Sequence, residues 1–121
     1  MPSSFQLGAF QQTGMGGPGI APPNITTLAG AARTVTGTDN IGANDFTILA
    51  DASGGAFTET LPAAVSYPNR IFNIKKIDAS ANVVTVGVTG GNTIDGVGSK
   101  TLTVQYQSIM VQSNGANWFV I

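Results

Sequence analysis

Three glycines near the start of the chain have the spacing of a phosphate-binding loop. Gly14, Gly16 and Gly19 satisfy the pattern G-x-G-x-x-G, which binds a dinucleotide where a buried strand ends and a helix begins. The preceding segment, FQLGAFQQT, is too polar for a buried parallel strand, and Pro22 and Pro23 disfavour a helix after the glycines. We therefore expect an extended arm here, with no nucleotide site and no cofactor.

Six carboxylates are the next candidates for chemistry. Glycoside hydrolysis would need two of them at a set separation across a cleft. The aspartates lie beside Gly, Asn, Ser or Ala, as is typical of turns, and Glu59 lies within a strand-like stretch where we expect it to face solvent. The absence of histidine excludes histidine-based acid–base catalysis and triads. These residues predict a non-enzymatic protein, with a carbohydrate-active enzyme as an alternative. The five aspartates are Asp39, Asp45, Asp51, Asp78 and Asp95.

The remaining polar and aromatic side chains are candidates for metal or sugar binding. The chain has no cysteine and no histidine, so the common zinc and haem ligand sets are absent, as are disulfides. Residues 39–45 (DNIGAND) offer the oxygen ligands that calcium prefers, but they lack EF-hand spacing, and we expect a turn. Tyr67, Tyr106 and Trp118 could stack on sugars, but aromatic residues in strands and turns are more typical of a core. We predict no metal site.

The composition limits the classes of partner. Charged residues make up 9% of the chain and the net charge is −1, so there is no basic field to hold nucleic acid. Lys75 and Lys76 are the only adjacent basic pair, and we expect them at a solvated strand end. No apolar stretch is long enough to span a bilayer, and no signal peptide is recognised, which predicts synthesis in a cytoplasm without membrane insertion.

The chain divides into an arm and a β-domain. Residues 1–32 form a Gly/Pro-rich arm, and residues 33–121 carry short alternating runs of β-branched and aromatic residues. Asp95-Gly96 predicts a turn, and Asn114-Gly115 predicts a hairpin. The fold class is all-β, a small antiparallel sandwich or barrel-like module. The expected strands lie within residues 33–37, 45–51, 56–62, 70–78, 83–88, 100–106, 108–113 and 118–121.

Two further patterns concern how the strands associate. Asp51-Ala52-Ser53 and Asp78-Ala79-Ser80 both follow a strand and precede another, which we interpret as repeated hairpins. The last strands carry apolar residues on both faces: Met110 opposes Ile109 and Val111, and Phe119 opposes Trp118 and Val120. A homo-oligomer can bury both faces, whereas a tight sandwich with a few exposed side chains is the alternative.

Several segments together resemble a β-module of tailed-bacteriophage fibre and head-decoration proteins. They are DFTILADASGGAFTETLPAA, IFNIKKIDASANVVTV, NTIDG and KTLTVQYQSIMVQSNGANWFVI, within about residues 38–121. The resemblance rests on their order, because no single segment is specific. It implies an intertwined homotrimer without catalytic residues. The interface expected for that trimer consists of Ile94, Leu102, Val104, Ile109, Val111, Trp118 and Val120.

The resemblance also implies a place in the virion. The chain has no repetitive shaft like that of a long tail fibre, and the arm before the β-module is uncharged. This arrangement predicts a capsid decoration protein on the outer capsid surface, made in the bacterial host and bound to the major capsid protein. A tail-associated receptor-binding protein that grips host surface glycan is the alternative. The expected capsid anchor consists of Phe5, Leu7, Phe10, Met15 and Ile20.

Overall fold

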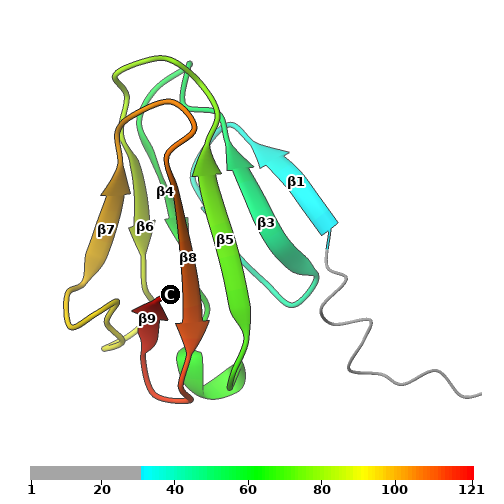
Figure 1. Ribbon diagram of the computed structural model, residues 1–121, viewed down its shortest axis with the longest axis vertical. Coiled ribbons are helices and arrows are strands. Elements are labelled where there is room, and N and C mark those ends of the chain that lie inside the picture. Colours follow the sequence, from blue (N-terminus) through cyan, green and yellow to red (C-terminus); the bar gives the residue numbers. More distant parts are fainter. Residues whose placement is uncertain (1–30) are drawn as a thin grey trace, which may run out of the picture.

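The first six strands in the described part of the protein alternate between two sheets. The computed structural model describes residues 31–121. One sheet has the strand order β1-β3-β5-β8-β9 and the other has the order β2-β4-β6-β7, and the two face each other as layers (Figure 1). The strands are β1 Ala31–Val35, β2 Asp39–Asn40, β3 Asp45–Ala50, β4 Phe57–Thr60, β5 Ile71–Lys76, β6 Val84–Gly87, β7 Ser99–Leu102, β8 Ser108–Ser113 and β9 Trp118–Val120, with a short 3-10 helix, η1, at Ala64–Ser66. The all-β prediction is therefore confirmed.

The sheets are mixed, and the predicted antiparallel pairing is wrong for their first half. β1 pairs with β3, β3 with β5, β2 with β4 and β4 with β6, and all four pairs are parallel. Parallel neighbours need a crossover, and here each crossover is a strand of the opposite sheet. Each pair of consecutive strands from β1 to β6 thus makes one coil of a short two-sheet solenoid, stacked on the coil before it.

The two Asp-Ala-Ser segments occupy equivalent corners of adjacent coils, and the interpretation as repeated hairpins is wrong. Asp51 and Asp78 follow β3 and β5, which pair in parallel with Ala50 opposite Lys76. The backbone N–H of Ala52 donates to Oδ1 of Asp78 over 2.7 Å, which joins the two corners directly. Their spacing of 27 residues, from position 51 to position 78, is the length of one coil.

The last three strands close the solenoid with antiparallel pairs. β7 pairs with β6, β8 with β5, and β9 with β8. The predicted hairpin is confirmed, because the Asn114 N–H donates to the Asn117 carbonyl over 3.1 Å and Gly115 has a φ of +90°. The predicted turn at Asp95-Gly96 is also confirmed: both residues have positive φ, and the flanking Ile94 and Val97 form a β-bridge.

The core lies between the sheets and centres on Trp118. Its ring lies 5.6 Å from the Phe72 ring, between centroids, and its indole N–H donates to the Pro62 carbonyl over 3.1 Å. Ile48, Ile74 and other aliphatic side chains fill the rest of the space. Trp118 is the only tryptophan of the chain, so its fluorescence reports on the packing of this core.

Candidate functional site

Arg33 on β1 binds two carboxylates, those of Asp39 and Asp45, near the start of β3. Its Nε donates to Oδ1 of Asp45 over 2.7 Å, and its Nη2 donates to Oδ2 of Asp39 over 2.5 Å. Burial works against the ionisation of Asp45, but the hydrogen bonds from Arg33 and from the Gly42 N–H outweigh it and hold the pKa of Asp45 below its usual value. The bonds to Asp45 and then Asp39 raise the pKa of Arg33. With Glu59, these residues form what we call the Arg33 cluster.

Glu59 is the buried member of the Arg33 cluster, and the prediction that it faces solvent is wrong. Its side chain is 0% exposed, and neither carboxylate oxygen has a hydrogen-bond donor. Asp39 on β2 lies directly opposite Glu59 on β4 in the parallel register, so the two carboxyl groups project from the same side of the sheet. Burial, with a further contribution from the neighbouring Asp39, raises the pKa of Glu59 to about 8.

A second polar group, which we call the Asp78 network, lies at the far end of the strands. It consists of Lys76, Asp78, Ser80, Asn82 and the backbone of Ala52. Lys76 is 0% exposed, and its Nζ donates to Oδ2 of Asp78 over 2.7 Å, so the expectation of a solvated lysine pair is wrong for Lys76. Desolvation opposes the charge on Asp78, but hydrogen bonds from Lys76, Ser80 and Ala52 outweigh it and lower the pKa of Asp78.

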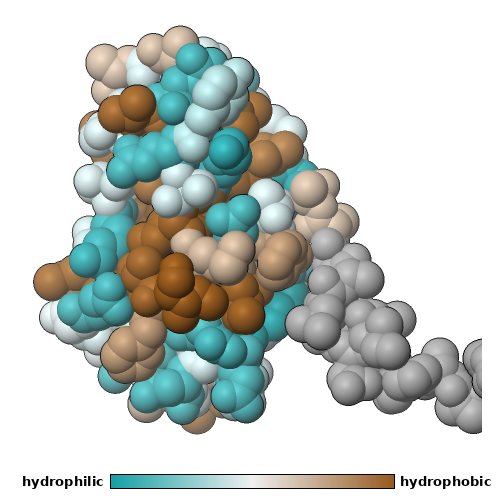
Figure 2. All heavy atoms as spheres, in the orientation of Figure 1, coloured by the Kyte–Doolittle hydropathy of each residue, from teal (hydrophilic) through white to brown (hydrophobic). Residues whose placement is uncertain are grey.

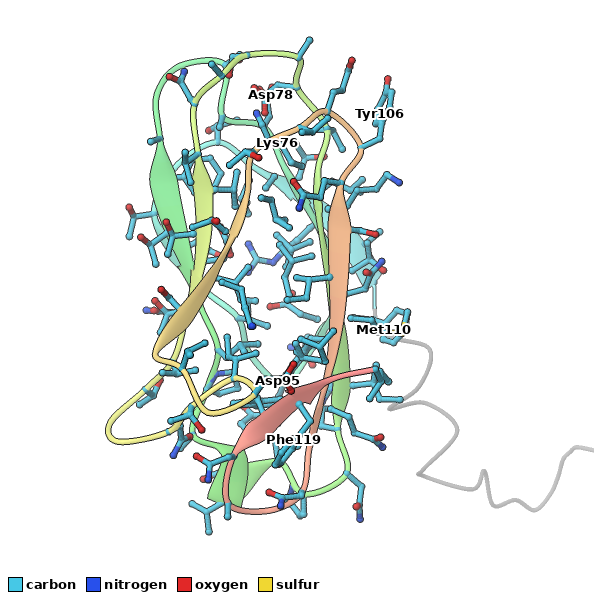
Figure 3. The ribbon with its side chains drawn as sticks, turned by 60° about the vertical axis from the view of Figure 1, so that its left-hand side comes forward. Lys76, Asp78, Asp95, Tyr106, Met110 and Phe119 are labelled. Atoms are coloured by element: carbon cyan, nitrogen blue, oxygen red, sulfur yellow. The ribbon has the colours of Figure 1, made fainter. Side chains whose placement is uncertain are left out.

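The loop between β7 and β8 projects from the same end as the Asp78 network (Figure 3). Tyr106 in this loop is 61% exposed and has a φ of +68°, an uncommon conformation for a bulky residue. Its N–H donates to the Lys76 carbonyl over 2.7 Å, and the side-chain oxygen of Gln107 accepts from the N–H of Thr103 and of Val104. The loop thereby displays an aromatic ring on a backbone fixed by hydrogen bonds.

The three aromatic residues considered for sugar stacking lie in different environments. Trp118 is buried in the core, and Tyr67 packs against the core with its ring 6.1 Å from that of Phe72. Tyr106 alone of the three presents its ring to solvent, where Nζ of Lys75 lies 5.7 Å from the ring centroid. A cation at this distance adds a polar group beside the exposed ring.

The carboxylates do not assemble into a metal site within residues 31–121. No group of three or more Asp or Glu side chains in this part of the chain is arranged to hold a metal ion. Asp39 and Asp45, the acidic ends of the segment 39–45 in which a turn was expected, bind Arg33, and residues 41–44 between them form the connection from β2 to β3. Glu59 is enclosed between the sheets, so a polysaccharide chain could not reach it without opening them.

The residues expected at a trimer interface are divided between core and surface. Ile94, Leu102, Val111 and Trp118 are buried within a single chain, so they do not offer surface to a neighbour. Ile109 is partly buried and packs against the same core. Val104 and Val120 are 63% and 40% exposed. The expected anchor residues Phe5, Leu7, Phe10, Met15 and Ile20 lie outside the described residues.

Comparison of the chain with protein-family models, with curated proteins and with solved structures finds no match. Within residues 31–121, no helix has the length and apolar character needed to cross a membrane.

Proposed function

We propose that the protein is a non-enzymatic structural protein of a tailed-bacteriophage virion, a capsid decoration trimer held to the major capsid protein by its N-terminal arm. One observation carries the proposal: a charge-poor β-domain follows thirty residues that contain no charged side chain but several large apolar ones. The resemblance of residues 38–121 to phage fibre and head-decoration modules supports it. So does the apolar surface that the described fold leaves exposed near its last strand.

The proposed mechanism is attachment by several weak contacts. Apolar side chains of the arm, such as Phe5, Leu7 and Phe10, would each bury a modest area in pockets of the capsid surface. Three arms on one trimer would act together, because binding of the first arm raises the effective concentration of the other two. The β-domain would then stand on the capsid as a trimer and reinforce the lattice.

Substitution of the arm tests this attachment. The variant is full-length protein with Phe5→Ser, Leu7→Ser and Phe10→Ser. We expect at least about ten-fold less of it than of wild type to pellet with phage heads that lack the protein. Each arm loses its apolar anchors, and the loss of affinity multiplies over three arms. The matched control replaces Gln6, Gln11 and Gln12 with Ser and should pellet like wild type. Equal pelleting of the two variants would contradict the anchor.

Host-glycan binding is a second candidate function, and Tyr106 is the observation that favours it. A tyrosine ring that is 61% exposed and held in a fixed loop can stack on the apolar face of a sugar. We expect Tyr106→Ala to abolish saturable binding to host surface polysaccharide while co-sedimentation with heads is unchanged. Wild-type protein without measurable polysaccharide binding, in a titration to millimolar sugar, would remove this candidate.

A further inference from the structure

The outward side of β8 and β9 carries large apolar side chains that nothing in the chain's described part covers. Val111 points into the core, so its neighbour Met110 points away from it, and Figure 3 shows Met110 directed outward from the sandwich. Phe119 pairs with Gln112 on this outward side, and the Ile121 N–H donates to the Met110 carbonyl over 2.9 Å. We call Met110, Phe119 and Ile121 the outward face; they are 37%, 41% and 59% exposed.

The three side chains of the outward face are apolar and carry no charge. Figure 2 shows hydrophobic residues gathered over β8 and β9. Neither strand contains a charged residue, since their sequences are SIMVQS and WFV. Soluble monomers rarely expose contiguous apolar patches of large size, so a patch of this kind indicates an interaction site. A partner that uses charge for recognition would find no complementary group on it.

The edge of β9 is closed to strand addition. In the hairpin, Phe119 directs its backbone groups toward β8, so Trp118 and Val120 direct theirs toward the free edge. The turn at residues 93–95 occupies that edge: Trp118 N–H donates to the Thr93 carbonyl over 2.9 Å, and Val120 N–H donates to Oδ1 of Asp95 over 3.1 Å. The Trp118 carbonyl accepts from the Asp95 N–H. A partner must therefore contact side chains instead of extending the sheet.

We propose that a second copy of this chain packs on the outward face, with Phe119 and Met110 of one copy against the same side chains of the next. The inference deepens the proposed function and rests on its trimer. Uncharged apolar side chains can pack against identical side chains without burying a charge, and copies with a net charge of −1 repel one another weakly. When such a face lies at a symmetry axis, every copy presents it to its neighbours, so one apolar face is buried by identical faces.

The test compares three full-length variants by sedimentation velocity at the same protomer concentration. Met110→Glu combined with Phe119→Glu is expected to shift the wild-type oligomer to monomer, because charges would be buried at the contact. Val65→Glu, at a valine that is 72% exposed on η1, is the matched control and should leave the oligomer intact. Val104→Glu tests the predicted interface residue in the β7–β8 loop. Trp118 fluorescence confirms that each variant is folded.

The outcomes separate the inference from the trimer proposal. An oligomeric wild type that becomes monomeric only in the Met110/Phe119 variant supports the inference. If the oligomer survives in that variant, or is lost only in Val104→Glu, the outward face is not the contact, although the trimer stands. A wild type that remains monomeric at high protein concentration overturns both the inference and the trimer.

A second measurement does not depend on disrupting the fold. The chain contains no cysteine, so Gln112→Cys, which pairs with Phe119 on the same side of the sheet and leaves the three apolar side chains in place, gives a single site for a nitroxide spin label. We expect dipolar broadening between labels of neighbouring copies, which is lost on dilution with unlabelled protein. Val65→Cys is the control and should show no broadening. Equal spectra for the two labelled sites would overturn the contact, whatever the oligomeric state.

Discussion

At pH 8, Glu59→Gln is expected to exceed wild type in free energy of unfolding by a few kcal/mol, whereas near pH 5 the two proteins should agree within about 1 kcal/mol. Glu59 is buried without a hydrogen-bond donor and lies opposite Asp39, so its charged form is disfavoured in the folded state. Glutamine has the shape of the protonated acid and cannot ionise. The substitution therefore removes the cost of charging without opening a cavity.

Wild type is expected to lose stability as pH rises because the pKa of Glu59 is raised, to about 8 in the folded protein against an ordinary value of 4.5. Between these values the folded protein holds a proton that the unfolded chain has released. Stability from this group is therefore fully present below pH 4.5 and falls as pH rises toward 8, with a limiting slope of about 1.4 kcal/mol per pH unit. Asp45 and Asp78 have lowered pKa values, so their contributions change at acid pH and are constant in this range.

The charge balance of the Arg33 cluster agrees with a protonated Glu59. Arg33 bonds the carboxylates of Asp39 and Asp45, and the Arg70 guanidinium lies beside Asp45, where it donates to the backbone carbonyls of Ala43 and Asp45. Two cations thus lie near these two carboxylates. Ionisation of Glu59 would add a third negative charge with no positive partner. In the sheet of β2, β4, β6 and β7, Lys100 on β7 lies in register with Glu59 on β4, but Val86 on β6 lies between the two.

The measurement is urea unfolding of both proteins at pH 5, 6, 7 and 8, followed by Trp118 fluorescence. Protomer concentration is fixed, because oligomerisation changes apparent stability. Asp51→Asn is a control, since that carboxylate bonds the N–H of Ser53 outside the Arg33 cluster. Parallel pH profiles for wild type and Glu59→Gln would show that Glu59 does not titrate in this range.

Strand positions could be predicted from the sequence, whereas their pairing could not. Alternating residues at 70–78 and 83–88 predict strands that the structure places as β5 and β6. The alternation of apolar and polar residues shows which side chains lie on each face of a strand. It is the same whether the neighbouring strands are parallel or antiparallel. The informative signal was the spacing of Asp51 and Asp78, since a repeat of 27 residues is too long for a hairpin and has the length of a solenoid coil.

The buried charges could not be predicted because local sequence favours exposure. Glu59 lies between threonines and Lys76 follows another lysine, which is the composition of a solvated strand. The burial of Glu59 places it beside Asp39, which is distant in sequence. Lys76 bonds the nearby Asp78, but Asp78 is itself held by Ala52 of the preceding coil, which local sequence does not reveal. The short strand β2 escaped prediction for a similar reason, because two residues carry no periodicity.

Lys76→Ala is expected to lower the free energy of unfolding by about 3–5 kcal/mol, the range typical of a buried ion pair that loses one member. The Lys76 ammonium is enclosed and bonds Oδ2 of Asp78, and Asp78 in turn holds the N–H groups of Ala52 and Ser80. Without the lysine, Asp78 retains its charge at the junction of two coils. The adjacent Lys75→Ala is the matched control and should cost less than about 1 kcal/mol, since Lys75 is partly exposed and its ammonium lies beside the exposed Tyr106 ring.

Removal of both charges distinguishes an ion pair from simple loss of packing. Lys76→Met keeps the apolar stem of the lysine, and combined with Asp78→Asn it leaves no unpaired charge while the amide oxygen can still accept from Ala52. We expect this double variant to be more stable than Lys76→Met alone in urea unfolding at pH 7, because an isolated buried charge costs more than a neutral pair. Strict additivity of the two substitutions would mean that Lys76 and Asp78 act independently, and the corner between coils would then be held by the Asp78 backbone bonds alone.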